Sequence, residues 1–168
     1  MKRSSHSGPG PLVNSRLWKW FFPTVIMIVI MAFNGDELAH KLAVQAKQKL
    51  SAFHGIDHVA LKIKKCEITI SDEGFLRYRK TYISGKQEYY SFNLSRLQSI
   101  DYLGSSGSGN LIIRTMEDDI IVQTYNDRSG NVDSMSVDMK ISLQAIEAED
   151  LAGLQQDLFE LKRLVSRN

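Results

Sequence analysis

The sequence contains very little cysteine. Cys66 is the only one among its 168 residues. A single cysteine excludes an intramolecular disulfide, a zinc site made of several thiolates and a CxxC redox motif. Because an exposed free thiol is reactive outside the cytosol, we expect Cys66 to be buried.

The main part of the chain also lacks an excess of positive charge. The formal net charge is +2, but four of the 21 lysine and arginine residues (Lys2, Arg3, Arg16 and Lys19) precede the longest apolar run. The other 17 stand against 19 acidic residues, so the rest of the chain has a formal charge of −2. Proteins that bind nucleic acids usually carry a clustered basic surface, and we therefore expect no nucleic-acid partner.

Recognisable catalytic motifs are absent as well. The segment GSSGSGN, residues 104–110, is neither a nucleophile elbow nor a phosphate-binding loop, because no Lys-Ser/Thr pair follows it. The histidines at 40, 54 and 58 have no nucleophile elbow to complete a triad, and no carboxylate pair falls on predicted inward strand positions. We predict a protein that is not an enzyme, with a hydrolase as the less favoured reading.

Residues 20–33, WFFPTVIMIVIMAF, form the longest apolar run, with 14 residues. This length fits the apolar part of a signal peptide, about 7–15 residues, better than a membrane helix of roughly 20. Basic residues precede the run and acidic residues follow it, an order that predicts export. The cleavage motif is poor, with Ala32 the best position, and residues 17–33 could instead remain as a membrane anchor. A buried core helix is the third interpretation of this apolar run.

Residues 36–53 have the spacing of an amphipathic helix. The apolar positions that define the stripe are Leu38, Leu42, Ala46, Leu50 and Phe53. Asn34 and Glu37 are placed to form a capping box, and Gly55 supplies a stop.

After Gly55 the apolar residues alternate, which predicts β-strands. The alternation changes phase at Lys64–Lys65, where we expect a β-bulge. Seven or eight short strands follow at hairpin spacing, over about 59–70, 75–83, 87–94, 99–103, 111–116, 119–125 and 133–143. Their connections are too short for parallel crossovers, so we expect an antiparallel sandwich or barrel.

The chain ends in a predicted helix over about 147–166. Its apolar residues form one stripe, which must pack against a barrel mouth or a sheet face: Leu151, Leu154, Leu158, Leu161 and Val165.

This order of elements over 58–166 resembles the pleckstrin-homology-like fold. With the preceding helix and the hairpin LIIRTMEDDIIVQTY, it is similar to uncharacterised exported bacterial proteins that contain such a domain. The resemblance implies an α+β fold in which two near-orthogonal sheets make a barrel and the last helix plugs one end. A lipocalin-like barrel with the helix outside, and an open sheet packed on two helices, are the alternatives. The expected domains are a signal peptide or anchor at 1–33, a helix at 34–55 and the barrel domain at 56–168.

The resemblance also suggests an anion site. In phosphoinositide-binding members of the family, basic residues at the first hairpin grip phosphates. The matching candidates here are Lys64, Lys65, Arg77 and Arg79. The turn between them, 71–74, carries two acids, and the alternative reading is a solvated strand face.

Two polar segments resemble metal sites only superficially. His54, Asp57 and His58 match no known ligand spacing. In NDRSGNVD, 126–133, the glycine is misplaced for a calcium loop and the bidentate glutamate is missing, so we predict a hairpin turn. We expect no metal and no cofactor.

Six tyrosines remain the most suggestive feature, as interface residues or, more simply, as strand-packing residues. The favoured function is an exported, periplasmic or secreted, non-enzymatic binding module. It would recognise a peptide, protein or lipid through a sheet edge or a groove beside the closing helix. The alternative is a membrane-tethered accessory subunit of an envelope complex, held by residues 17–33.

Overall fold

The computed structural model describes residues 35–55 and 61–167. The chain divides into two units, Met1–Asn34 and Gly35–Asn168, and every described residue belongs to the second. The expected signal peptide or anchor and the Asn34 cap therefore lie outside the described residues. In the part that is described, no helix has the length and apolarity that a membrane span needs.

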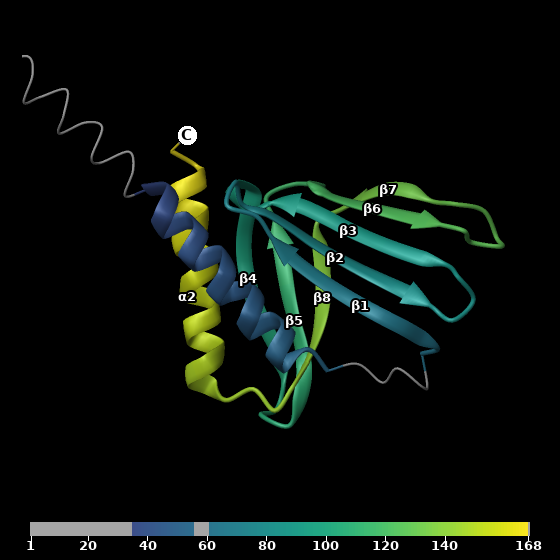
Figure 1. The fold of residues 1–168 in the computed structure, drawn as a ribbon, viewed down its shortest axis with the longest axis horizontal. Coiled ribbons are helices and arrows are strands. Elements are labelled where there is room, and N and C mark those ends of the chain that lie inside the picture. The colour runs from purple at the N-terminus through teal and green to yellow at the C-terminus, as the bar shows by residue number, and fades with distance from the viewer. Residues whose placement is uncertain (1–34, 56–60, 168) are drawn as a thin grey trace, which may run out of the picture. The chain divides into compact units, whose positions relative to one another are not determined.

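The second unit is an α+β structure with two antiparallel sheets and two helices (Figure 1). The five-stranded sheet has the order β1 (Ile63–Ile70), β2 (Phe75–Tyr82), β3 (Gln87–Asn93), β6 (Ile120–Tyr125), β7 (Asp133–Ser136). The three-stranded sheet has the order β4 (Leu97–Gly104), β5 (Ser108–Thr115), β8 (Asp138–Gln144). A helix over 35–53 precedes the strands, η1 (Leu94–Arg96) connects β3 to β4, and α2 (Ala148–Val165) ends the fold. The predicted closed barrel is wrong, because the two sheets remain separate and do not close.

The predicted bulge in the first strand is confirmed. The register between β1 and β2 shifts between Ile63 and Lys65. The extra residue moves the strand's later apolar residues back to the inner face, which is why the sequence alternation changes phase there.

The single strand predicted over 133–143 is wrong. It is two strands in different sheets, because β7 pairs with β6 and β8 pairs with β5. The chain changes sheets at Val137, whose carbonyl accepts a hydrogen bond from Thr115 N. Ser136 Oγ accepts from Asp138 N and donates to the Asp138 carbonyl, which fixes this break. Alternation continues through the break, so periodicity alone does not reveal it.

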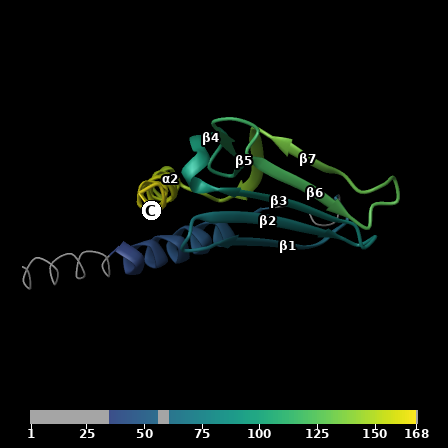
Figure 2. The same cartoon turned by 90° about the horizontal axis from the view of Figure 1, so that it is seen from above.

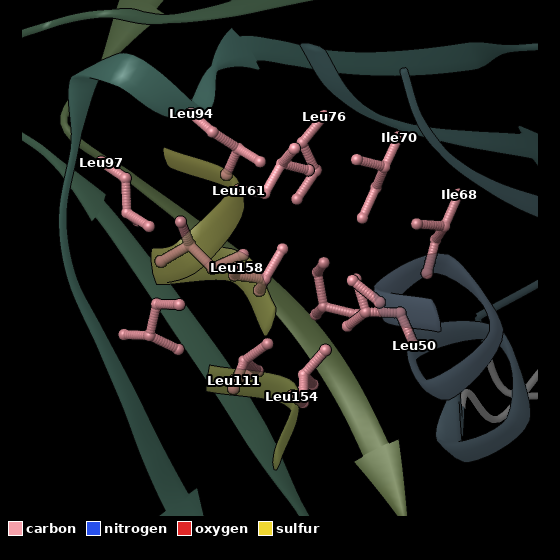
Figure 3. Packing of buried hydrophobic residues seen from close by; sticks show 14 of the residues in the cluster. Leu50, Ile68, Ile70, Leu76, Leu94, Leu97, Leu111, Leu154, Leu158 and Leu161 are labelled. Atoms are coloured by element: carbon pink, nitrogen blue, oxygen red, sulfur yellow. The ribbon is translucent and has the colours of Figure 1, made fainter. Parts of the chain in front are cut away.

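The core lies where α2 packs between the sheets. Leu154, Leu158 and Leu161 are fully buried, as the predicted stripe requires. Figure 3 shows them among leucines and isoleucines of both sheets and Leu50 of the 35–53 helix. Acidic residues in the first turn of α2 and basic residues in its last turn complement the helix dipole.

The 35–53 helix is confirmed, but its buried stripe is displaced. Leu38, predicted to be part of the stripe, is exposed, whereas Ala39 and Ala43 are buried. Small residues there let the helix backbone approach the core closely. Lys49 Nζ lies 2.7 Å from Asp157 Oδ2 and ties this helix to α2.

The five-stranded sheet extends beyond the elements that cover it. In both views its strands project away from α2 and past the three-stranded sheet (Figures 1 and 2). Along β2, Leu76 and Tyr78 are fully buried, whereas Lys80 and Tyr82 are partly exposed. We call the face that carries these four residues the inner face, and the opposite face the outer face.

Candidate functional site

The structure gathers two of the four predicted anion-binding residues around a carboxylate. Glu67 pairs with Arg79 across β1 and β2 on the outer face. Lys65 Nζ lies 2.6 Å from Glu67 Oε1, and Arg79 donates to Oε2 from Nε, at 2.8 Å, and from Nη2. Lys65 first, and then Arg79, lower the pKa of the Glu67 carboxyl. The Glu67 carboxylate thus occupies the position that a bound anion would take.

The other two candidates stand apart from that carboxylate. Lys64 lies at the bulge and is exposed. The guanidinium of Arg77 lies 5.5 Å from the ring centroid of Phe75. Among the described residues, neither Lys64 nor Arg77 takes part in an ion pair. The four candidates therefore do not converge on one site.

Apolar side chains lie exposed beside these arginines on the outer face. The strand registers place Arg77 next to Ser91, Ser91 next to Ile121, and Ile121 next to Met135. Ile121 is 40% exposed and Met135 is 56% exposed. We define the outer patch as the seven apolar, aromatic and arginine residues of this face: Phe75, Arg77, Arg79, Tyr89, Ile121, Tyr125 and Met135. Arginine, methionine and aromatic residues are the types enriched in protein interfaces.

The inner face carries a different arrangement, centred on Tyr78. Its hydroxyl is hydrogen-bonded to Nε2 of His54 at 2.9 Å and donates to the Cys66 sulfur at 3.9 Å. Its ring stacks against Tyr90 with centroids 6.2 Å apart. Burial raises the pKa of Tyr78 far above its ordinary range, so the hydroxyl stays protonated.

Next to Tyr78, Lys80 lies between two aromatic rings. Its Nζ is 5.2 Å from the centroid of Tyr78 and 5.3 Å from that of Tyr90, which is the geometry of a cation–π contact. The nearest carboxylate oxygen, on Glu88, is 3.9 Å away. Only 19% of the Lys80 side chain is exposed.

Glu88 receives several donors at the edge of this arrangement. Lys86 Nζ lies 3.2 Å from Glu88 Oε1 and 2.9 Å from Asp127 Oδ2. The Tyr90 hydroxyl donates to Glu88 at 3.5 Å. Burial, and then Glu88, raise the pKa of Tyr82, and the same two causes raise the pKa of Tyr90. We define the Lys80 cluster by the six residues Tyr78, Lys80, Tyr82, Lys86, Glu88 and Tyr90.

Cys66, expected to be buried, is partly buried beside this cluster. Burial raises the pKa of its thiol, although the hydrogen bond from Tyr78 and the charge of Lys80 oppose the shift. The thiol form therefore dominates at neutral pH, and nucleophilic chemistry needs the thiolate. The cluster offers a cation, neutral hydroxyls and aromatic faces, which are groups that bind ligands.

The suspected metal residues do not come together in the described part of the chain. His40 pairs with Asp72 at 3.0 Å and His54 with Tyr78, while Asp57 and His58 lie outside the described residues. Asp127 is held by Lys86 and accepts from Ser129 N, as expected for a hairpin turn. No group of three metal-ligating side chains is present among the residues that the structure describes.

The Lys80 cluster is the feature that sequence reasoning missed. Three of its tyrosines stood out in the sequence, but the pairing of Lys80 with Glu88 did not. Their pairing depends on the register of β2 against β3, in which Lys80 lies opposite Glu88 and Tyr78 opposite Tyr90. In both strands a tyrosine lies two residues from a charged residue: Tyr78 and Lys80 in β2, and Glu88 and Tyr90 in β3. This matching pattern was the signal that the sequence offered.

The chain matches no protein-family model, no curated protein and no solved structure. Inferences about its function therefore depend on the geometry of the two faces of the five-stranded sheet.

Proposed function

We propose that this protein is a non-enzymatic interaction domain that binds a protein partner through the outer patch. The observation that supports this most directly is the exposed pair Ile121 and Met135, adjacent across β6 and β7. Exposed apolar groups that lie next to one another on a regular surface are typical of interaction sites. Arg77 and Tyr89 beside them add the side chains that most often anchor interfaces.

Two of the sheet edges, at β1 and β4, support peptide binding less well than this face does. β1 is an edge strand that carries two exposed lysines and a bulge. These features oppose the pairing of another strand. Side chains of α2 occupy carbonyls of β4, because Gln155 donates to Ile100 O and Lys162 donates to Leu97 O. The flat outer face is therefore favoured over the edges at β1 and β4.

Lipid or phosphate recognition at the first hairpin is also less favoured. Glu67 already pairs with both Lys65 and Arg79 and cancels one of their two positive charges. A free anion would have to displace a tethered carboxylate whose pKa those cations lower. The arginines of the outer patch are better suited to a protein surface, where they can pack as well as pair.

The test compares variants of the full chain in the cells that naturally produce it. The tagged protein is cross-linked and its bound partners are identified for Ile121→Asp and for the matched control Leu103→Asp, an exposed leucine on β4. We expect a partner that the wild type and the control retain and that Ile121→Asp loses, with all three proteins equally folded by circular dichroism. Equal retention by Ile121→Asp would contradict the proposal.

Export and the pleckstrin-homology-like fold also remain part of the proposal. Two antiparallel sheets with a terminal helix support the fold, although the sheets do not close into the barrel that the resemblance implies. The intact mass of the protein in fractionated cells tests export. A mass that includes residues 1–32 in the membrane fraction would indicate the tethered subunit, and a shorter mass in the soluble exported fraction would indicate cleavage.

A further inference from the structure

Lys80 is a largely covered cation that forms only a long ion pair, with Glu88, among the described residues. Nζ of Lys80 forms no hydrogen bond with any residue that the structure describes, and its closest carboxylate oxygen is 3.9 Å away. Every fully buried side-chain nitrogen and oxygen in the described part has a hydrogen-bond partner. Nζ therefore remains in reach of solvent, although most of its side chain is covered. A cation placed in this way can accept an anion without rearrangement of the sheet.

The charges around Lys80 select the kind of anion. Lys80 and Lys86 are balanced by Glu88 and Asp127, so this set of four groups is neutral. A monoanion adds one negative charge near Glu88, whereas a phosphate dianion adds two at the same place. A single carboxylate is therefore preferred over a phosphate.

The surroundings of Lys80 select the rest of the ligand. Its neighbours are the rings of Tyr78 and Tyr90 and, one strand away, the thiol of Cys66. Tyr78 is fully buried, whereas Tyr82 and Tyr90 are partly exposed on the same face. This end of the inner face thus offers the rings of Tyr82 and Tyr90 to an apolar chain.

We infer that Lys80 binds the carboxylate of an amphipathic monocarboxylate, a free acyl chain, whose apolar part lies on the aromatic surface of the open inner face. The Tyr82 and Tyr90 hydroxyls stay protonated and so add no negative charge beside the bound carboxylate. The site is on the face opposite the outer patch and acts independently of it.

The experiment titrates the full chain with decanoate, below its micelle concentration, by calorimetry and by NMR of the lysine side chains. We expect saturable binding that shifts the Lys80 signals. Lys80→Gln should weaken binding roughly tenfold to a hundredfold, the loss expected for one charge-assisted hydrogen bond. The matched control Lys65→Gln, an exposed lysine of the outer face, should bind as the wild type does.

Two further ligands test the selection on the wild type alone, whatever the stability of the variants. Decanol lacks the charge and decyl phosphate carries more of it, so both should bind more weakly than decanoate. The inference is overturned if decanoate does not bind, if decanol or decyl phosphate binds equally well, or if Lys80→Gln stays folded and keeps full affinity. Ile121→Asp should bind decanoate normally, which separates this result from the protein-binding proposal.

Discussion

The covered and open halves of the inner face differ in chemistry although they share the same strands. In the covered half, Leu76 and Phe92 lie opposite each other on β2 and β3, and both are buried. Four residues away on the same strands, Lys80 lies opposite Glu88. The backbone pairing is the same, and what changes is the presence of α2 and the three-stranded sheet over the side chains. Where this cover ends, residues with an apolar body and a polar tip replace aliphatic ones.

Tyr78 marks the boundary between the halves. Its ring is fully buried against the core cluster, and its hydroxyl bonds to His54 and Cys66. Tyr78 therefore contributes apolar area on one side and a hydrogen bond on the other. The halves are continuous, and we expect the energetic importance of a residue to fall with distance from α2.

The largest effect is expected in the covered half, from Leu158→Ala. Leu158 is fully buried between the sheets. Truncation of a buried leucine leaves a cavity and typically lowers the free energy of unfolding by about 2–5 kcal/mol. Urea unfolding followed by circular dichroism measures the change. The comparison predicts a much smaller loss for Lys86→Ala in the open half, and equal losses would contradict it.

A smaller effect is expected at the boundary, from Tyr78→Phe. This variant keeps the buried ring and removes the hydroxyl that bonds to His54 and Cys66. We expect a loss of about 1–2 kcal/mol in the free energy of unfolding, the usual range for a buried hydrogen bond. Tyr125→Phe removes an exposed hydroxyl that donates to Gln123 and should change stability by less than about 0.5 kcal/mol. If Tyr78→Phe and Tyr125→Phe were equally stable, Tyr78 would not be the boundary between the covered and open halves.

The ion pair between the 35–53 helix and α2 allows a test of how these two helices are held together. Lys49 and Asp157 are partly buried, with 32% and 15% of their side chains exposed. Lys49→Met keeps the aliphatic stem but leaves Asp157 without its cation, and we expect a loss of about 1 kcal/mol. The double variant Lys49→Met/Asp157→Leu should recover part of that loss. If neither variant changes urea unfolding, the pair does not hold the 35–53 helix on α2.

Sequence periodicity predicted the elements of the covered half well. The stripe of α2, the hairpins of β1, β2 and β3 and the bulge at Lys64–Lys65 all follow from local patterns, because each depends on residues a few positions apart. The break at Val137 was missed, and the predicted hairpin LIIRTMEDDIIVQTY is wrong, because β6 pairs with β3 and β7 whereas β5 pairs with β4 and β8. Both depend on contacts between distant segments, and the alternation of apolar residues is the same on either side of the break.

The candidate sites were less predictable for the same reason. Charge alone identified Lys65 and Arg79, but only the strand register places Glu67 between them. The tyrosines were visible as a group, whereas the position of Lys80 between two of them required the pairing of β2 with β3. Residue types can be read from a sequence, but the neighbours that decide their chemistry come from the fold.

The smallest effect on stability is expected on the outer face, from Glu67→Gln. The cations of Lys65 and Arg79 lower the pKa of this carboxyl, so its contribution to stability is present above the ordinary pKa of 4.5 and is lost as pH falls through the lowered value. Glu67→Gln should therefore flatten the acid side of a plot of unfolding free energy against pH. High salt should reduce the difference from the wild type, because the pair is exposed to solvent.

The same variant reveals what Glu67 does to the predicted anion site. With the carboxylate replaced by an amide, Lys65 and Arg79 become available to a free anion, and we expect inorganic phosphate to bind Glu67→Gln more tightly than the wild type in a calorimetric titration. Arg79→Gln in the same background should remove that gain. If the wild type already binds phosphate as tightly as Glu67→Gln, the outer face is an anion site in spite of Glu67. Anion recognition would then extend to the outer face. The two anion sites would differ only in the charge of the ligand that each prefers.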